Sequence, residues 1–405
     1  MPKRLKWELS WSGSAAVPRA LVQTSPGTFR KECDSEEKFY RSMALAFNKL
    51  EKEHWCIYCL YALRFEPSFT GACSTVDALR QVWKALRFEY PGLSVVPEGF
   101  TTVYVLPDTS KVEDWANQTF VESTSILARP PELEAIPWTT EIRNLSPSME
   151  DAVGPPEPTS SVMEEIARSI IETFHKSILN NCGLPYKGDL TTIPIVSTRS
   201  AVVFSKESTS AFVTACKARN ISVTAAIHVA LAETVFGVSL EDKDYSTVMS
   251  VNLRKYLQPP YRTQAHACQT YVSSIAPTVL RNSTFSKRTA VLMNDYKNWH
   301  TDEHMISLRL LYKHHAAAIL DRKGPPLAPP SGVFLSSLSV MLLYPWTFKG
   351  RLNLSINYNE AYYNDLTARD VLNSVHTVLE TESWSPTMVA YAAPYSGSLK
   401  STVNI

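Results

Sequence analysis

Histidine is the side chain that most readily takes a proton near neutral pH, so the nine histidines bear first on the chemistry of this chain. His228 lies in the segment TAAIHVALAETVF, which is apolar on every side and therefore predicts a buried helix. An imidazole held beside a cavity in such a core could act as a general base. A single histidine on a buried helix is more often a hydrogen-bonded core residue, and both interpretations stay open.

Two further pairs of histidines have suggestive spacings. His300 and His304 stand four residues apart, as in a helical metal pair, but the run HTDEH is charged and no third ligand is evident. His314 and His315 fall in a helical pattern that favours the surface. We predict no metal site.

Cysteine, serine and glycine patterns exclude other chemistries. Cys56 and Cys59 form a CxxC, but the strand pattern around them places their side chains on opposite faces. There is no GxSxG motif, so Ser336, Ser337 and Ser339 are expected to pack or to contact a ligand. The sequence also lacks GxxxxGK[ST] and GxGxxG, which argues against phosphate-loop and dinucleotide sites.

The balance of charges limits the partners. The chain has 40 Lys and Arg against 39 Asp and Glu, a net charge of +1, which gives no reason to expect nucleic acid or an anionic membrane as a partner. Seven cysteines, mostly in apolar runs, indicate a reducing compartment. The opening MPKRLKWELSWSG lacks an apolar run, and the apolar tract around Val333 to Trp346 is too short to span a bilayer. We expect a cytoplasmic monomer without a membrane contact.

Strand and helix patterns alternate along the chain, which favours an α/β fold. We predict an N-terminal lobe, 1–190, which includes a proline-rich crossing segment at 129–158, and a C-terminal lobe, 191–405. Helices are expected at 35–52, 75–90, 163–179, 209–218, 222–236, 284–318 and 366–382, and strands at 54–65, 101–107, 201–204, 246–254, 268–279, 346–350 and 351–359.

Several of these segments together resemble a known family. The run 201–236, followed by MSVNLRKYLQPPY, QTYVSSIAPTV, FLSSLS and WTFKGRLNLSINYNEAYY, is similar to the fungal trichothecene acetyltransferase-like family of the CoA-dependent acyltransferase and condensation-domain superfamily. The resemblance extends from about Trp7 to Glu380. It implies a two-lobed α/β fold with a central tunnel between the lobes.

The resemblance also implies a site. Acetyl-CoA is the implied co-substrate, a small hydrophobic metabolite is the implied partner, and no tightly bound cofactor is expected. Arg254 is expected to have a structural role and, if buried, to pair with a carboxylate across the two lobes. The residues implied to line a substrate pocket are Thr224, Ser250, Asn252, Tyr271, Ser336 and Tyr358.

The motif that carries catalysis in this superfamily is missing. There a His-x-x-x-Asp loop supplies the imidazole that takes the proton of the acceptor hydroxyl. None of the nine histidines has an Asp four residues later, and His376, followed by Glu380, is the nearest match. The chain passes from EDWANQTFVESTS directly to LARPPELEAIPW where the motif is expected, and a second shortening follows SSLSV. We therefore expect a shortened first lobe, from repurposing or from a shortened gene model.

Three functions are compatible with these observations. The leading hypothesis is O-acyl transfer, typically acetyl transfer, from acyl-CoA to a hydroxylated terpenoid or polyketide of fungal secondary metabolism. The alternative is a cyclase of Diels-Alder type, which needs an apolar pocket and a hydrogen bond more than a base. The third is a non-catalytic carrier or pseudoenzyme. No catalytic residue is assigned, and His228 is the one candidate.

Overall fold

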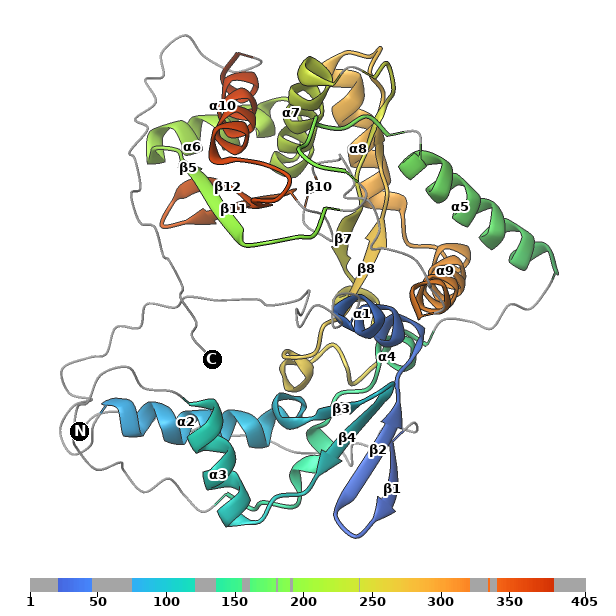
Figure 1. The fold of residues 1–405 in the computed structure, drawn as a ribbon, viewed down its shortest axis with the longest axis vertical. Helices are drawn as coiled ribbons and strands as arrows, with labels where there is room; N and C mark the ends of the chain where they lie inside the picture. Colours follow the sequence, from blue (N-terminus) through green and yellow to red (C-terminus); the bar gives the residue numbers. More distant parts are fainter. Residues whose placement is uncertain are drawn as a thin grey trace. The chain divides into compact units, whose positions relative to one another are not determined.

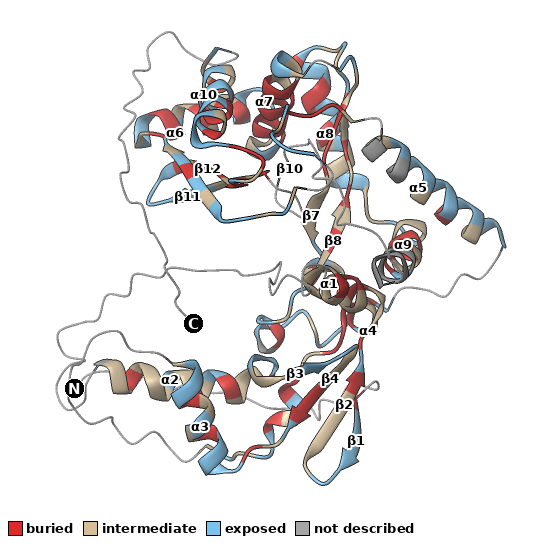
Figure 2. Cartoon of the chain, viewed as in Figure 1, coloured by how far each residue is buried: buried red, intermediate tan, exposed pale blue. Residues whose placement is uncertain are grey.

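The buried helix predicted around His228 is present in the computed structural model. It is α7, Val223–Val238, and it begins where the hydroxyl of Ser222 accepts a hydrogen bond from the amide of Ala225 (3.1 Å). Every residue from Ala225 to Ala232 is buried, because this stretch of the helix has no polar face to turn to water. Figure 2 shows α7 largely buried, whereas α5, Ser161–Leu179, is exposed along most of its length.

The described residues form two compact units, and each is treated by itself. Unit 1 takes in the described residues of 1–155, 252–272 and 312–320, and unit 2 those of 156–251, 273–311 and 321–405. Each unit therefore combines segments from distant parts of the chain, and the lobe boundary predicted at residue 190 stays a prediction. The structure describes residues 21–45, 75–120, 136–154, 161–179, 181–189, 192–239, 241–320, 334–335 and 341–381.

Unit 1 is built on a four-stranded antiparallel sheet in the order β1-β2-β4-β3 (Figure 1). The predicted strand TTVYVLP forms β4, and the predicted helix that Pro91 ends forms α2. Its elements are β1 (Leu21–Ser25), β2 (Thr28–Glu32), α1 (Ser35–Leu45), α2 (Thr75–Glu89), η3 (Pro91–Ser94), β3 (Val96–Glu98), β4 (Thr101–Val105), α3 (Thr109–Thr119), η4 (Glu141–Asn144), α4 (Met149–Val153), η5 (Arg254–Tyr256) and η6 (Gln264–His266).

Unit 2 contains a second sheet, ordered β10-β11-β12-β5, and the helices α6, α7 and α10 that pack with it (Figure 1). Strands β11, β12 and β5 are antiparallel, whereas β10 runs parallel to β11. The short pairs β6-β9 and β7-β8 lie outside this sheet. Its elements are α5 (Ser161–Leu179), β5 (Ser197–Val203), α6 (Lys206–Ala218), α7 (Val223–Val238), β6 (Tyr245–Ser246), β7 (Met249–Asn252), β8 (Val272–Ile275), β9 (Thr278–Val279), α8 (Phe285–Asn298), α9 (Asp302–Leu320), β10 (Phe334–Leu335), β11 (Met341–Phe348), β12 (Arg351–Asn359) and α10 (Asp365–Thr381). The last residue of β7, the first residue of β8 and the part of α9 from Tyr312 onward belong to unit 1.

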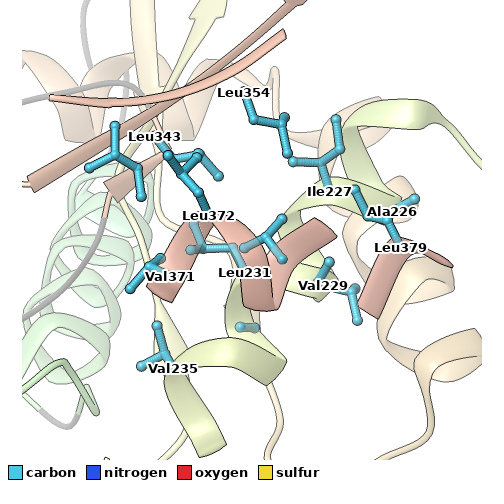
Figure 3. Packing of buried hydrophobic residues seen from close by; sticks show 14 of the residues in the cluster. Ala226, Ile227, Val229, Leu231, Val235, Leu343, Leu354, Val371, Leu372 and Leu379 are labelled. Carbon is cyan, nitrogen blue, oxygen red and sulfur yellow. The ribbon is translucent and has the colours of Figure 1, made fainter. Parts of the chain in front are cut away.

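The core of unit 2 forms where α7, α10 and the sheet meet. Leu231 of α7, Leu372 of α10 and Leu354 of β12 belong to one cluster and are fully buried (Figure 3). Every second residue of β12 from Leu352 to Tyr358 is buried toward this core, and Ser355 and Asn359 on the opposite face are buried as well. The aliphatic run in α7 thus fills the space between a helix and a sheet.

The structure differs from the sequence expectation in one long segment. The predicted helix 284–318 is two helices, α8 and α9, separated at Trp299–Thr301. The hydroxyl of Thr301 accepts a hydrogen bond from the amide of His304 (3.1 Å), so it caps the new helix. The predicted strand 54–65 and most of the predicted crossing segment lie outside the described residues.

Truncating a core side chain of α7 tests this packing. Leu231→Ala should lower the free energy of unfolding by about 2 to 5 kcal/mol, because it leaves a cavity between α7 and its neighbours. Val238→Ala, at the exposed end of the same helix, is the matched control and should cost less than about 1 kcal/mol. Urea denaturation followed by circular dichroism measures both, and equal losses would contradict the core assigned to α7.

Candidate active site

His228 is enclosed in the middle of α7. Its exposure is 0 %, and its Nδ1 lies 2.6 Å from the phenol oxygen of Tyr296 on α8. The ring of Tyr245 meets it edge to face, with 5.8 Å between centroids. The second ring nitrogen, Nε2, is buried and has no hydrogen-bond partner in the described part of the chain. Of the two ring nitrogens of His228, only Nδ1 therefore has a hydrogen-bond partner among the described residues.

Burial keeps this group of side chains uncharged. It lowers the pKa of His228 to about 3, and it raises the pKa of the Tyr296 and Tyr245 phenols well above the ordinary value. A neutral imidazole can accept a proton in principle, but none of this ring reaches solvent. The arrangement fits the core interpretation of His228, and a catalytic role for it stays a prediction.

A second group of polar side chains gathers three of the predicted site residues in unit 1. We call it the Arg254 cluster, and its centre is Arg254 at the start of η5. Asn252 accepts a hydrogen bond from the Arg254 amide (2.9 Å), and the guanidinium lies over the ring of Tyr271 at 5.4 Å from its centroid. The cluster consists of Ser146, Asn252, Arg254, His266 and Tyr271.

The described partners of Arg254 are backbone groups. Its guanidinium donates to the carbonyls of His266 (3.1 Å), Ala267 (2.6 Å) and Gln269 (2.6 Å). These bonds fix the segment that carries His266. A carboxylate partner across the two lobes stays a prediction.

His266 is the residue of this cluster that the sequence did not single out. It is 6 % exposed, and its Nδ1 lies 2.9 Å from the hydroxyl of Ser146. Burial, and after it the positive charge of Arg254, lowers the pKa of His266, so the imidazole is neutral at pH 7. When Nδ1–H donates to Ser146, the lone pair on Nε2 is available to take a proton. No spacing rule could reveal this pair, because its members are 120 residues apart.

The other predicted pocket residues are dispersed. Thr224 is exposed in the first turn of α7, and Ser250 is half-buried in β7. Tyr358 is buried near the end of β12, where Asp365 and Ser200 influence its pKa, which burial raises. Ser336 lies outside the described residues, as do Cys56 and Cys59. Among the described members of the predicted set, the structure brings Asn252, Arg254 and Tyr271 together.

The histidine pair considered for a metal has other contacts. His304 donates from Nε2 to the carbonyl of Ser274 (3.2 Å), and burial lowers its pKa to about 4. Across the described ranges no group of three His, Cys, Asp or Glu side chains is arranged to hold a metal ion. His314 and His315 lie in α9, as the helical pattern predicted.

Comparison with known proteins identifies the family. No model of a known protein family matches the sequence. The chain is 39% identical to the O-acetyltransferase pigM of Monascus ruber, with 89% of this chain and 86% of the relative aligned. It is 38% identical to the azaphilone biosynthesis cluster protein M of Aspergillus terreus, over 88% of this chain and 96% of that protein. The chain belongs to this family of fungal acetyltransferases.

The fold of a solved structure agrees with that membership. The trichothecene 15-O-acetyltransferase of Fusarium sporotrichioides superposes with a TM-score of 0.64 at 13% identity, covering 90% of this chain and 99% of that one. The resemblance drawn from the sequence is confirmed, as is the α/β fold of the CoA-dependent acyltransferase type. The central tunnel stays a prediction.

The alignment with the pigM relative bears on the predicted shortening. It extends over 441 positions, more than the 405 residues of this chain. The alignment therefore contains gaps in this chain, opposite residues of the relative. The gaps support an internal shortening of this chain, but they do not show where in the chain it lies.

No single helix in the described ranges is long and apolar enough to cross a membrane, and α6 and α7 reach the required length only as a pair bent by 101°.

The neutral His228 predicts an acid-sensitive fold. Its folded pKa of about 3 lies below the ordinary value of about 6.5, so the unfolded chain binds the proton first as the pH falls. The contribution of neutral His228 to the unfolding free energy is complete above about pH 6.5. It is lost as the pH falls toward 3, at up to ~1.4 kcal/mol per pH unit. His304 adds a contribution of the same sign.

Two variants separate the contribution of His228. His228→Phe should flatten the pH dependence of the unfolding free energy between pH 7 and pH 5. Tyr296→Phe keeps the imidazole buried and should leave that slope in place. Urea titrations at several pH values measure both, and an unchanged slope in His228→Phe would rule out the assignment.

Proposed function

We propose that the protein transfers an acetyl group from acetyl-CoA to a hydroxyl group of an azaphilone-type polyketide, as a monomer in the fungal cytoplasm. The observation that carries this proposal is the 38–39% identity to an O-acetyltransferase and to an azaphilone cluster protein over nearly the whole chain. The same fold in a trichothecene acetyltransferase supports it.

The reaction sets a clear chemical demand. The acceptor oxygen forms a bond with the thioester carbonyl carbon, the C–S bond of acetyl-CoA breaks, and the thiolate that leaves takes up a proton. A base must remove the acceptor hydroxyl proton as the oxygen attacks. In a chain without His-x-x-x-Asp, that base must come from another position.

Of the two imidazoles described above, His266 meets this demand better than His228. Both are neutral at pH 7, but His228 lies at 0 % exposure in the middle of the apolar helix α7, whereas His266 is 6 % exposed at the end of the short helix η6. The bond to Ser146 sets the ring orientation, and the three carbonyl contacts of Arg254 hold the loop. We assign His266 the role of general base, with Arg254 as a positioning residue.

A direct assay tests acetyl transfer. Purified protein, acetyl-CoA and hydroxylated azaphilones should release free CoA thiol and yield a product heavier by one acetyl group. Thiol release without acetylated product, or neither of the two, would contradict the proposal.

Substitution of His266 tests the assigned base. His266→Gln should lower kcat by about 100-fold or more, because general base catalysis contributes that much. His376→Gln, on α10, is the control and should retain activity. In the wild-type protein kcat/KM should fall on the acid side at a pH below about 6.5, since the pKa of His266 is lowered. Full activity of His266→Gln would remove the base assignment and leave acetyl transfer standing.

Cyclisation is the second candidate, and the absence of His-x-x-x-Asp favours it. An apolar pocket that positions a polyene needs no base. This function would show as a changed product ratio in a spontaneous cyclisation, with no thiol released from acetyl-CoA. Binding of the metabolite without either reaction would indicate a carrier.

A further inference from the structure

The contact between Ser146 and His266 brings a hydroxyl and an imidazole within hydrogen-bond distance. The Ser146 oxygen lies 2.9 Å from Nδ1 of His266, and both residues belong to unit 1. The bond can run in either direction, because a neutral imidazole carries its proton on one nitrogen and accepts at the other. With the proton on Nε2, Nδ1 accepts from the serine hydroxyl. In this tautomer the imidazole is a base in contact with a possible nucleophile.

The backbone on both sides of Ser146 is held in place. The residue lies between η4 and α4 and precedes Pro147, which disfavours a helical backbone at this position. The phenol of Tyr271 donates to the carbonyl of Pro147 (3.1 Å). On the other side, the amide group of the Asn144 side chain donates to the carbonyl of Phe88 (3.0 Å). These bonds present the serine hydroxyl at a fixed position.

Two kinds of contact orient the imidazole of His266. The ring of Tyr261 meets it edge to face, with 5.2 Å between centroids. The guanidinium of Arg254 donates to the carbonyl of His266 (3.1 Å) and to those of Ala267 and Gln269. A nucleophile and a base in hydrogen-bond contact, with the base oriented by further groups, are the structural signature of covalent catalysis.

Ser146 is more open to solvent than its partner. It is half-buried, whereas His266 is 6 % exposed. Part of the serine is therefore free to contact a ligand, while the base behind it stays covered. Burial also keeps the imidazole neutral by lowering its pKa, and only a neutral imidazole can take the serine proton. The pair thus combines an accessible residue that carries a hydroxyl with an uncharged base.

We propose that Ser146 is a nucleophile that takes the acetyl group from the donor and passes it to the acceptor, while His266 moves the proton. The inference deepens the proposed function and rests on it for the identity of donor and acceptor. In place of a direct attack by the acceptor on the thioester, the transfer then has two steps, and an acetyl ester of Ser146 lies between them.

The two steps balance without a further reactant. In the first, the Ser146 oxygen forms a bond with the thioester carbonyl carbon, its proton passes to Nδ1 of His266, the C–S bond breaks, and the leaving thiolate takes that proton. In the second, the acceptor oxygen attacks the acetyl ester and gives its proton to Nδ1. The ester bond to Ser146 breaks, and the serine oxygen takes the proton back.

An activated ester tests the nucleophile without CoA. With p-nitrophenyl acetate, the wild-type protein should release a burst of p-nitrophenol that matches the protein concentration, and mass spectrometry of its peptides should find the acetyl group on Ser146. Ser146→Ala should lose both the burst and the label. His266→Gln should slow the burst by about 100-fold or more. Ser146→Cys keeps a nucleophile and should regain a label.

The control removes a serine elsewhere in unit 1. Ser110→Ala, at an exposed position on α3, should give the burst and the label of the wild-type protein. Circular dichroism checks that each variant is folded. A wild-type label on the exposed thiol of Cys268 or on a lysine, in place of Ser146, overturns the inference. An undiminished burst in folded Ser146→Ala overturns it as well.

Steady-state kinetics separate this inference from the proposed function. Initial rates at varied acetyl-CoA and hydroxylated azaphilone should give parallel double-reciprocal lines, and acetyl-CoA alone should leave an acetyl group on Ser146. Intersecting lines and acetylated product without an acetylated serine overturn the inference and leave acetyl transfer standing. Labelling of Ser146 by p-nitrophenyl acetate, without transfer to any azaphilone, supports the nucleophile and contradicts only the proposed function.

Discussion

The enclosure of α7 is the constraint on which unit 2 depends. A helix apolar on all sides must be covered on all sides, and each fully buried aliphatic side chain contributes about 1.5 to 3 kcal/mol relative to exposure. The sheet, α6, α8 and α10 supply that cover. Strands β11 and β12 contribute to this cover, since Leu231 and its neighbours share one core cluster with Leu343 and Leu354.

The same enclosure explains the state of His228. An imidazole placed among aliphatic side chains loses its hydration, so it stays neutral and shares its one described hydrogen bond with the phenol of Tyr296. Burial thus removes the charge, but it also removes access to solvent. His266 is buried to a lesser degree, at 6 % exposure, and it ends the short helix η6, where its Nδ1 meets the hydroxyl of Ser146.

The positive charge of Arg254 has a structural role. Its guanidinium donates hydrogen bonds to three backbone carbonyls and so fixes the segment that carries His266. The same charge, after burial, lowers the pKa of His266.

The sequence by itself determined those helices and strands whose pattern can be read from neighbouring residues. Apolar periodicity and capping residues such as Ser222 gave α7, and Pro91 gave the end of α2, since helix formation depends on neighbours within a few residues. The family also followed from sequence, because its segments keep their order. Only the tertiary structure decided that Ser146 meets His266 and that Arg254 donates to backbone carbonyls. These contacts join residues far apart in the chain, and no local pattern encodes which distant partners the packing of a core will bring together.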